Sequence, residues 1–218
     1  MLHQRKYVLD ILTDSGVTGA KPARFPLPQG LKLSLHEGAP LSDISYAVQH
    51  LSQFVSTPKE PHMAAAMHVL RYLKGTLSKG LFYPFQQSLK ITGFTDSDWA
   101  GCLMTRRSLT GYCIFMGHSL VSWKTKKQTT VSRSSTEAEY RSMASTTCEL
   151  LWLSYLLADL HVNIELPMTL FCDNKAAQLI AANPCYHERT KHLDIDCHFT
   201  REKIQDGFIQ TAHIPSSL

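Results

Sequence analysis

Acidic side chains at three separate places in the sequence have the types and spacing that could hold a divalent cation. Asp96 and Asp98 follow the apolar run ITGFT, Glu137 and Glu139 lie in SRSSTEAEY, and Asp173 ends MTLFCD. Carboxylate oxygens are the ligands that Mg²⁺ and similar hard cations prefer. Like charges held close together resist ionising unless a cation relieves them. The sequence therefore predicts a metal site, provided that the fold brings the three places together.

Each of these places also has a local explanation that needs no metal. Asp96 and Asp98 could be turn acids, the spacing of Thr136 and Glu139 fits a helix capping box, and Asp173 could cap a following helix. A shared site is favoured because two apolar strands and one long helix each deliver a carboxylate near an end.

Short apolar runs rich in β-branched and aromatic residues predict the strands that would carry two of the acidic places. Gly117-His118 predicts a tight turn that joins two of these strands as a hairpin. The predicted strands cover residues 81–85, 91–95, 111–117, 119–125, 168–172 and 208–214.

Apolar residues at helical spacing predict the helices, and the longest, about 136–157, would carry Glu139 at its start. From residue 91 onward the predicted order is β-β-β-α-β-α-α-β. This order predicts an α/β fold with a mixed five-stranded sheet flanked by helices, preceded by a small helical N-terminal region. The other predicted helices cover residues 3–15, 43–55 and 60–74, the stretch between Asn174 and Asn183, and about 193–205.

Composition and cysteine usage limit the class of protein. The 218 residues are 44% hydrophobic and 18% charged, which is typical of a globular chain with a real core. All six cysteines follow residue 100 without a CxxC pair, as expected for buried thiols of a reduced compartment. The N-terminus has no signal-peptide pattern, and no run approaches the ~20 apolar residues that span a bilayer. We expect a soluble, intracellular protein of the cytoplasm or nucleus, without a membrane partner.

Positive charge is concentrated between the first two acidic places. The formal net charge is +4, and no Asp or Glu occurs between Asp98 and Glu137. This stretch predicts contact with a polyanion, although a solvated basic face fits the pattern too. Its basic residues are Arg106, Arg107, Lys124, Lys126, Lys127 and Arg133.

Several motifs together resemble a known family. TDSDWAGC, RRSLTGYCIFMG, VSWKTKKQTTVSRSSTEAEYR, LFCDNKAA and RTKHLDIDCHFTREKI are similar to the ribonuclease H domain of copia-type LTR retrotransposon Pol polyproteins. Upstream, QRKYVLDILTDSGVTGAKP and FVSTPKEPHMAAAMHVLRYLKGT resemble the thumb and connecting region of the same polyprotein's reverse transcriptase. The resemblance implies a helical reverse transcriptase remnant over residues 1–88 and a ribonuclease H-like domain over residues 89–218.

The resemblance also implies an activity, a site and its cofactors. The domain would hydrolyse the RNA strand of RNA/DNA hybrids, with Asp96, Glu139 and Asp173 as catalytic metal ligands and Glu137 as the second choice on the helix. Two Mg²⁺ or Mn²⁺ ions, roughly 4 Å apart, would activate water and stabilise the departing 3′ oxygen. The partners would be the hybrid and the remainder of the Pol polyprotein. Phosphate contacts would come from Arg106, Arg107, Lys124, Lys126 and Lys127.

Two departures from the family pattern set further expectations. The family's fourth carboxylate lies a few residues beyond the strand FIQTAHIPSS, whereas this sequence stops at Leu218. We therefore expect cleavage weakened by truncation, with an inactive remnant that at most binds nucleic acid as the alternative. Polymerases of this family carry an aspartate pair, and the sequence has no Asp-Asp dipeptide, so we expect no polymerase activity.

Two other groups of residues are expected to be structural. Trp99 and Trp123 are predicted to lie in the core and not to act as stacking platforms. The second group imitates a zinc site, but the resemblance places it on a structural helix and its cap, with His192 near the cleft. This cluster consists of His192, Asp194, Asp196, Cys197 and His198.

Overall fold

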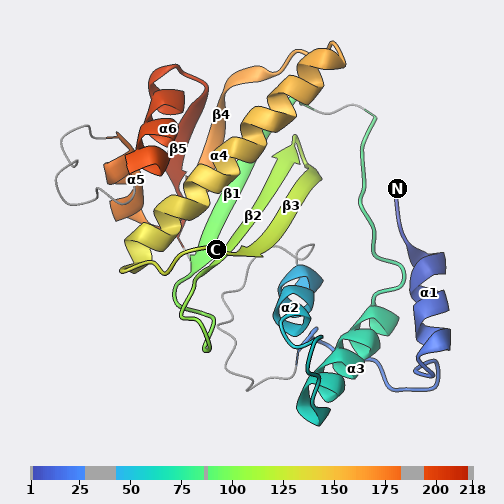
Figure 1. Cartoon of the computed structure of the whole chain (residues 1–218). Coiled ribbons are helices and arrows are strands. Elements are labelled where there is room, and N and C mark those ends of the chain that lie inside the picture. The colour runs from blue at the N-terminus through green and yellow to red at the C-terminus, as the bar shows by residue number, and fades with distance from the viewer. Residues whose placement is uncertain (1, 28–42, 86–87, 183–193, 216–218) are drawn as a thin grey trace. The chain divides into compact units, whose positions relative to one another are not determined.

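The computed structural model describes residues 2–27, 43–85, 88–182 and 194–215, which belong to two compact units. The described residues up to Pro84 form the first unit, and those from Phe85 onward form the second (Figure 1). In the part of the chain that the structure describes, no helix is long and apolar enough to cross a membrane.

Three helices make up the described first unit: α1 (Arg5–Asp14), α2 (Asp43–Ser52) and α3 (Glu60–Gly75). Helix α1 ends where Gly16 takes a φ of 68°, a left-handed conformation that glycine adopts without strain. Helices α2 and α3 pack together, and the Phe54 ring stacks on His62 with centroids 4.0 Å apart. These helices confirm the predicted helical N-terminal region.

The predicted strand at 81–85 is wrong. Leu81 makes only an isolated antiparallel bridge with Leu2. Pro84 has no amide hydrogen to donate to a ladder, which explains why aromatic residues alone do not form a strand here.

The second unit contains one five-stranded sheet, in the order β3-β2-β1-β4-β5. Strands β1, β2 and β3 pair antiparallel, whereas β4 runs parallel to both β1 and β5. Gly117 turns the chain between β2 and β3 with a φ of 58°. The mixed sheet confirms the expected fold class. Its strands are β1 (Lys90–Asp98), β2 (Leu109–Met116), β3 (Ser119–Lys127), β4 (Glu165–Cys172) and β5 (Ile209–His213).

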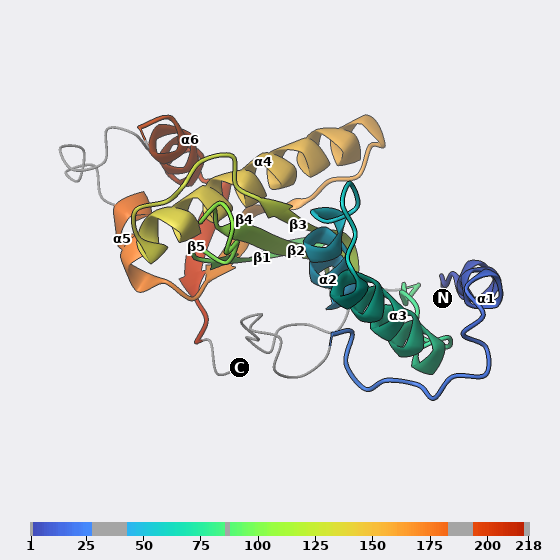
Figure 2. The same cartoon turned by 60° about the horizontal axis from the view of Figure 1, so that its bottom comes forward.

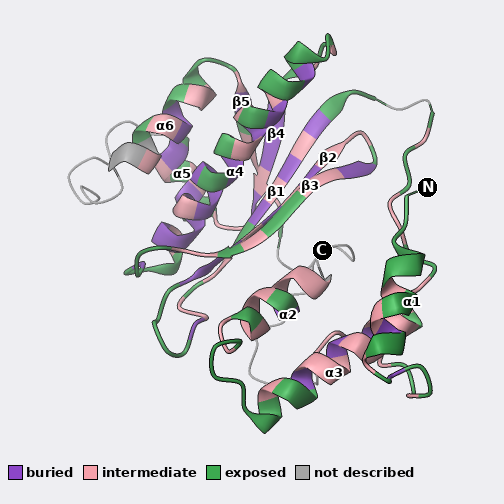
Figure 3. Ribbon diagram, turned by 45° about the vertical axis from the view of Figure 1, so that its right-hand side comes forward, coloured by how far each residue is buried: buried purple, intermediate pink, exposed green. Residues whose placement is uncertain are grey.

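Helix α4 (Ser135–Asp159) packs on β1, and α5 (Lys175–Ala182) and α6 (Asp194–Gln205) pack against α4 (Figure 2). Gly93 of β1 lies against α4, because an added Cβ would lie 3.5 Å from Thr146 Cγ2 and 3.6 Å from Leu150 Cδ1 of that helix. Figure 3 shows the buried face of α4 turned toward the strands. The core of this unit includes Ile91, Ile114, Tyr140, Met143, Leu150, Met168, Leu170 and Ile209.

Candidate metal centre

The sheet topology brings two of the predicted acids to the same edge. Thr95 of β1 pairs with Cys172 of the parallel strand β4, so Asp96 and Asp173 follow at the same level on neighbouring strands. Glu139 enters from the second turn of α4, and its Oε1 accepts a hydrogen bond from the Ser97 amide over 3.0 Å. The ends of two strands and the start of one helix therefore bring Asp96, Glu139 and Asp173 into one region, where the charges of Asp96 and Asp173 act on Glu139.

The electrostatics of Glu139 reflect this meeting. Its side chain is only 5% exposed. Burial, followed by the charges of Asp96 and Asp173, raises its pKa from 4.5 to about 8, although the hydrogen bond from the Ser97 amide lowers it. Without a cation, Glu139 is therefore largely protonated at neutral pH. A bound divalent cation would favour its ionised form.

The Cys172 thiol lies beside these carboxylates. Among the described residues, Glu139, Cys172 and Asp173 each offer a ligand atom within 4.8 Å of the others. Burial is the main cause that raises the pKa of the Cys172 thiol to about 12 in the absence of a metal, and the thiol lies 3.9 Å from Glu139 Oε2 as a hydrogen-bond donor. The carboxylate oxygens are donors that hard divalent cations prefer.

The two glutamates at the start of α4 have different surroundings. Glu137 Oε2 accepts from the Arg133 amide over 2.8 Å, and its Oε1 lies 3.1 Å from Arg141 Nη2. Its own amide donates to Ser134 Oγ over 3.2 Å. The alternative explanation, in which Glu139 forms a capping box with Thr136, does not hold, because Ser134 and Glu137 cap the helix. Glu139 is left to face the strand ends.

A stack of hydroxyl groups fixes α4 against the end of β1. Thr95 Oγ1 lies 2.7 Å from Ser142 Oγ, and Thr146 Oγ1 donates to Thr95 Oγ1 over 3.0 Å. Ser142 Oγ also donates to the Asp96 carbonyl over 2.7 Å. Ser142 lies three residues after Glu139 on the same helix face. The hydrogen bonds of this stack therefore fix the position of Glu139 relative to Asp96.

Asp98 lies at the very end of β1 and belongs to the following turn. The Gly101 amide donates to the Asp98 carbonyl over 3.3 Å. A Cβ added at Gly101 would collide with the Asp98 carboxylate, so a glycine is needed where the turn folds back. Of the two aspartates of β1, Asp96 is therefore the candidate ligand and Asp98 a turn acid.

The predicted basic residues lie at the same end of the sheet as the acids. In register, Asp98 pairs with Leu109, and Leu109 pairs with Lys127, which places β3 two strands, or about 10 Å, from β1. Lys127 is half-buried and its Nζ donates to Cys102 Sγ over 3.5 Å. The remaining four are exposed, in the loop before β2 and on the edge strand β3: Arg106, Arg107, Lys124 and Lys126.

The expectation that both tryptophans lie in the core is wrong. Trp99 is 50% exposed and Trp123 is 39% exposed. Trp99 follows β1 directly, and its indole Nε1 donates to the Ser132 carbonyl over 3.1 Å. Cys148 likewise departs from the expectation of buried thiols, since it is exposed.

The zinc-like cluster of the sequence can be followed only in part. His192 lies outside the described residues, as do the side chains of Asp194 and Cys197. Asp196 Oδ2 lies 3.9 Å from Arg141 Nη1, and burial raises the pKa of Asp196 while Arg141 lowers it. His198 Nδ1 lies 3.8 Å from Glu202 Oε2 on its own helix. These two pairs belong to the packing and surface of α6.

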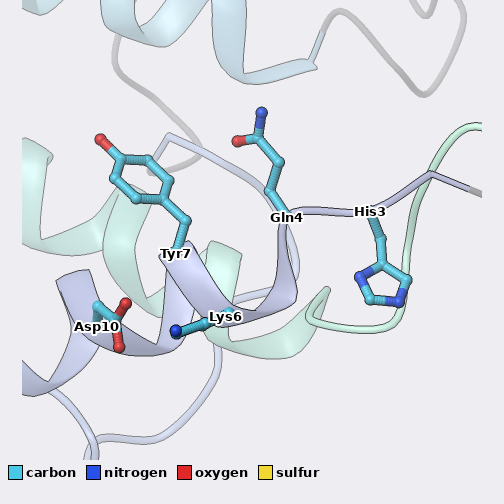
Figure 4. A pocket seen from close by; sticks show the side chains of 5 residues that line it. All are labelled: His3, Gln4, Lys6, Tyr7 and Asp10. Carbon is cyan, nitrogen blue, oxygen red and sulfur yellow. The ribbon is translucent and has the colours of Figure 1, made fainter.

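A surface pocket occurs in the first unit and involves none of these acids. It has a volume of about 600 Å³ and lies on α1 and the residues before it (Figure 4). A single carboxylate, that of Asp10, lines it beside one lysine, so the pocket lacks the donor set of a metal site. Its lining residues are His3, Gln4, Lys6, Tyr7 and Asp10.

Two residues of the centre were not expected from the sequence. Cys172 is the last residue of β4 and directly precedes Asp173, and Ser142 follows Glu139 by one helical turn. The sequence offers a signal for Ser142, because a serine at three residues from an acid on a buried helix face must find a partner. The closeness of Cys172 to Glu139 depends on the path of the chain at the end of β4. The hydrophobic periodicity of the sequence does not predict that path.

The mixed sheet, its long helix and the carboxylates at the strand ends define an α/β domain with a candidate metal centre. No protein-family model matches the chain. The retrovirus-related Pol polyprotein from transposon RE1 of Arabidopsis thaliana is 40% identical over 233 residues, covering 98% of this chain and 16% of that protein. The uncharacterized mitochondrial protein AtMg00810 of the same species is 42% identical over 172 residues, covering 70% of this chain and 72% of that protein.

Retrovirus-related Pol polyproteins therefore match nearly the whole of this chain at 31–40% identity. The chain spans 16% of the length of the RE1 polyprotein. Among solved structures, it is similar to LC11-RNase H1 in complex with an RNA/DNA hybrid, with a TM-score of 0.43 and 12% identity over 58% of this chain and 86% of that chain.

Proposed function

We propose that residues 89–218 form a metal-dependent ribonuclease H that hydrolyses the RNA strand of RNA/DNA hybrids. The observation that carries this proposal is the meeting of Asp96, Glu139 and Asp173 at one end of a ribonuclease H-like sheet. The identity of 40% to the RE1 Pol polyprotein over nearly the whole chain supports the same assignment.

The three carboxylates would hold two Mg²⁺ or Mn²⁺ ions. When bound, such ions activate the attacking water and stabilise the departing 3′ oxygen. The surrounding residues orient the ligands: the Ser97 amide holds Glu139, and the Ser142 hydroxyl holds the main chain at Asp96. Burial of Glu139 keeps bulk water away from one side of the site.

The substrate would be held by charge and recognised by shape. Exposed lysines and arginines at the same end of the sheet would contact phosphates, which gives affinity without reading sequence. Contacts to 2′-hydroxyl groups and to the A-like form of the hybrid would distinguish it from DNA. The residues proposed for phosphate contact are Arg106, Arg107, Lys124, Lys126 and Lys127.

Residues 1–88 would derive from the thumb and connecting region of the reverse transcriptase. The first unit's three helices are compatible with this origin. In the intact Pol polyprotein, the remaining segments would then be partners of this chain.

A cleavage assay on a labelled RNA/DNA hybrid tests the nuclease directly. The chain should cut the RNA strand with Mg²⁺ or Mn²⁺ and not with a chelator. Glu139→Gln should lower the rate by more than roughly 100-fold, since even outer partners of a metal ligand matter by 10–100-fold. Glu137→Gln is the matched control and should retain cleavage. A chain that binds the hybrid with either metal but never cuts it would contradict the nuclease and indicate a binding module.

A further inference from the structure

Two glutamine side chains donate hydrogen bonds to the main-chain carbonyls that directly precede Glu139 and Asp173. Gln128 Nε2 donates to the carbonyl of Ala138 over 2.9 Å, the residue before Glu139. Gln178 Nε2 donates to the carbonyl of Cys172 over 2.8 Å, the residue before Asp173. Each amide therefore acts on the backbone that carries a candidate ligand.

Gln128 connects the start of α4 to the ends of β1 and β2. Its Nε2 also donates to Thr110 Oγ1 over 3.1 Å and lies 3.4 Å from the hydroxyl of Ser97, which follows Asp96. Its Oε1 accepts from Ser132 Oγ over 2.9 Å. With both ends of the amide engaged in a partly buried place, the side chain has one orientation, and it fixes the distance between β1 and the first turn of α4.

Gln178 connects the two parallel strands β4 and β5 on the other side of the site. From α5 it bridges β4 and β5, because its Nε2 also donates to the Ala212 carbonyl over 2.9 Å. Next to it, His213 Nε2 lies 3.1 Å from the Asp173 carbonyl. The main chain at Asp173 is thus tied to both neighbours, α5 and β5.

The amide group suits this position chemically. It offers donors to carbonyl oxygens and carries no charge, so it neither neutralises the carboxylates nor competes with them for a cation. A glutamate of the same shape would place acceptors against carbonyl oxygens, and a lysine would pair with the acids. Metal ligands must be held to within about 0.5 Å for full affinity.

We propose that Gln128 and Gln178 are positioning residues that set the spacing of the candidate metal ligands and thereby the metal affinity of the site. This inference rests on the proposed function, because it requires Asp96, Glu139 and Asp173 to bind the cation. It goes beyond that function by assigning a role to two residues that touch neither metal nor substrate.

The test is a titration of the full 218-residue chain with Mn²⁺. Electron paramagnetic resonance of the free ion measures how much Mn²⁺ has bound. Gln128→Glu and Gln178→Glu should each weaken the affinity by roughly 10–100-fold, as is typical when an outer partner of a metal ligand is lost. The matched control is Gln210→Glu. Gln210 Nε2 also donates across strands, to Thr169 Oγ1 over 3.0 Å, but it lies away from the strand ends that carry Asp96 and Asp173. This control should change the affinity by less than about 3-fold.

A second readout separates positioning from a general loss of structure. In the hybrid cleavage assay, the Mn²⁺ concentration for half-maximal rate should rise in both variants, while the rate at saturating Mn²⁺ stays within about 3-fold of the parent chain. Where Gln128→Glu does not fold, Ser132→Ala removes only the bond to Gln128 Oε1 and should still weaken Mn²⁺ binding.

The outcomes distinguish the two proposals. A parent chain that binds no Mn²⁺ would contradict the proposed function itself. A parent chain that binds Mn²⁺, with folded variants that bind it equally well, would overturn the positioning role and leave the nuclease standing. An equal loss in Gln210→Glu would also overturn it, because the effect would then follow from removing any cross-strand amide.

Discussion

Glu139 shows at the scale of one residue how burial and charge prepare a cation site. An acid that is 5% exposed and near two other acids lies in an unfavourable place when ionised. A protonated Glu139 removes part of this cost, and a divalent cation removes it with the charge retained. The raised pKa and the predicted metal affinity therefore have a common cause.

The raised pKa of Glu139 predicts how stability depends on pH in the absence of divalent cations. The unfolded chain releases this proton near the ordinary value of 4.5, whereas the folded chain keeps it until about pH 8. The stabilising contribution is thus complete below pH 4.5 and is lost as pH rises through about 8. The melting temperature, measured with a chelator, should fall across this window, by about 2–4 °C per kcal/mol for a chain of this size.

Glu139→Gln provides the comparison for the pH dependence, because its neutral amide has nearly the same shape and does not titrate. The variant should show a flatter decline of melting temperature between pH 4.5 and 8, while Glu137→Gln should keep the decline. An equal slope in the parent chain and in Glu139→Gln would show that other groups cause the pH dependence.

At the scale of elements, the sequence predicts the long helix and the sheet well because their signals are local. The apolar repeat of α4 extends over six turns, and the strands β1 to β3 are short runs with clear breaks. The choice between Glu137 and Glu139 is different in kind, since both lie on the helix and only its rotation against the sheet decides which faces β1. That rotation depends on long-range contacts such as Ser142 to Asp96.

The helix cap gives a further prediction at this scale. Glu137→Ala should lower the free energy of unfolding by about 1–2 kcal/mol, because it removes the acceptor for the Arg133 amide and the partner of Arg141. Mn²⁺ affinity should stay unchanged, since this side chain faces away from the strand ends. Urea unfolding measures the first quantity and Mn²⁺ titration the second.

Thr136→Ala is the control for the cap, because the spacing of Thr136 and Glu139 fits a capping box that the structure does not form. It should cost less than about 0.5 kcal/mol. A larger loss for Thr136→Ala than for Glu137→Ala would contradict the cap formed by Ser134 and Glu137.

At the scale of the whole molecule, the chain divides into two units with separate packing. Composition alone predicts a globular chain. The change from helical to strand periodicity after residue 80, together with the resemblance to two parts of a Pol polyprotein, indicates a boundary in the sequence. The exposure of Trp99 and Trp123 could not be predicted, because tryptophan is usually well buried and its surroundings depend on which loops fold over it.

The separate core of the second unit predicts independent folding. Residues 85–218, expressed alone, should unfold cooperatively and bind Mn²⁺ with an affinity within about 3-fold of the full chain, since the sheet, α4 and the three carboxylates all lie within it. Calorimetry and Mn²⁺ titration of the fragment check this. A fragment that lacks a cooperative transition would show that its stability depends on the first unit.

The distribution of charge over the molecule gives the last prediction. Lys124 and Lys126 are exposed and lie two residues apart on the edge strand β3, so their side chains leave the same face of the strand. If both contact phosphates of the hybrid, replacing them with alanine removes two sites of counterion release. The slope of log K against log salt should then become shallower by roughly 1–2. Fluorescence anisotropy with a labelled hybrid, in chelator to prevent cleavage, measures this slope.

The double change Lys21→Ala and Lys59→Ala, at exposed positions of the first unit, alters the net charge equally and should leave the slope nearly unchanged. Equal effects of the two double variants would mean that net charge, and not contact along β3, governs binding of the hybrid.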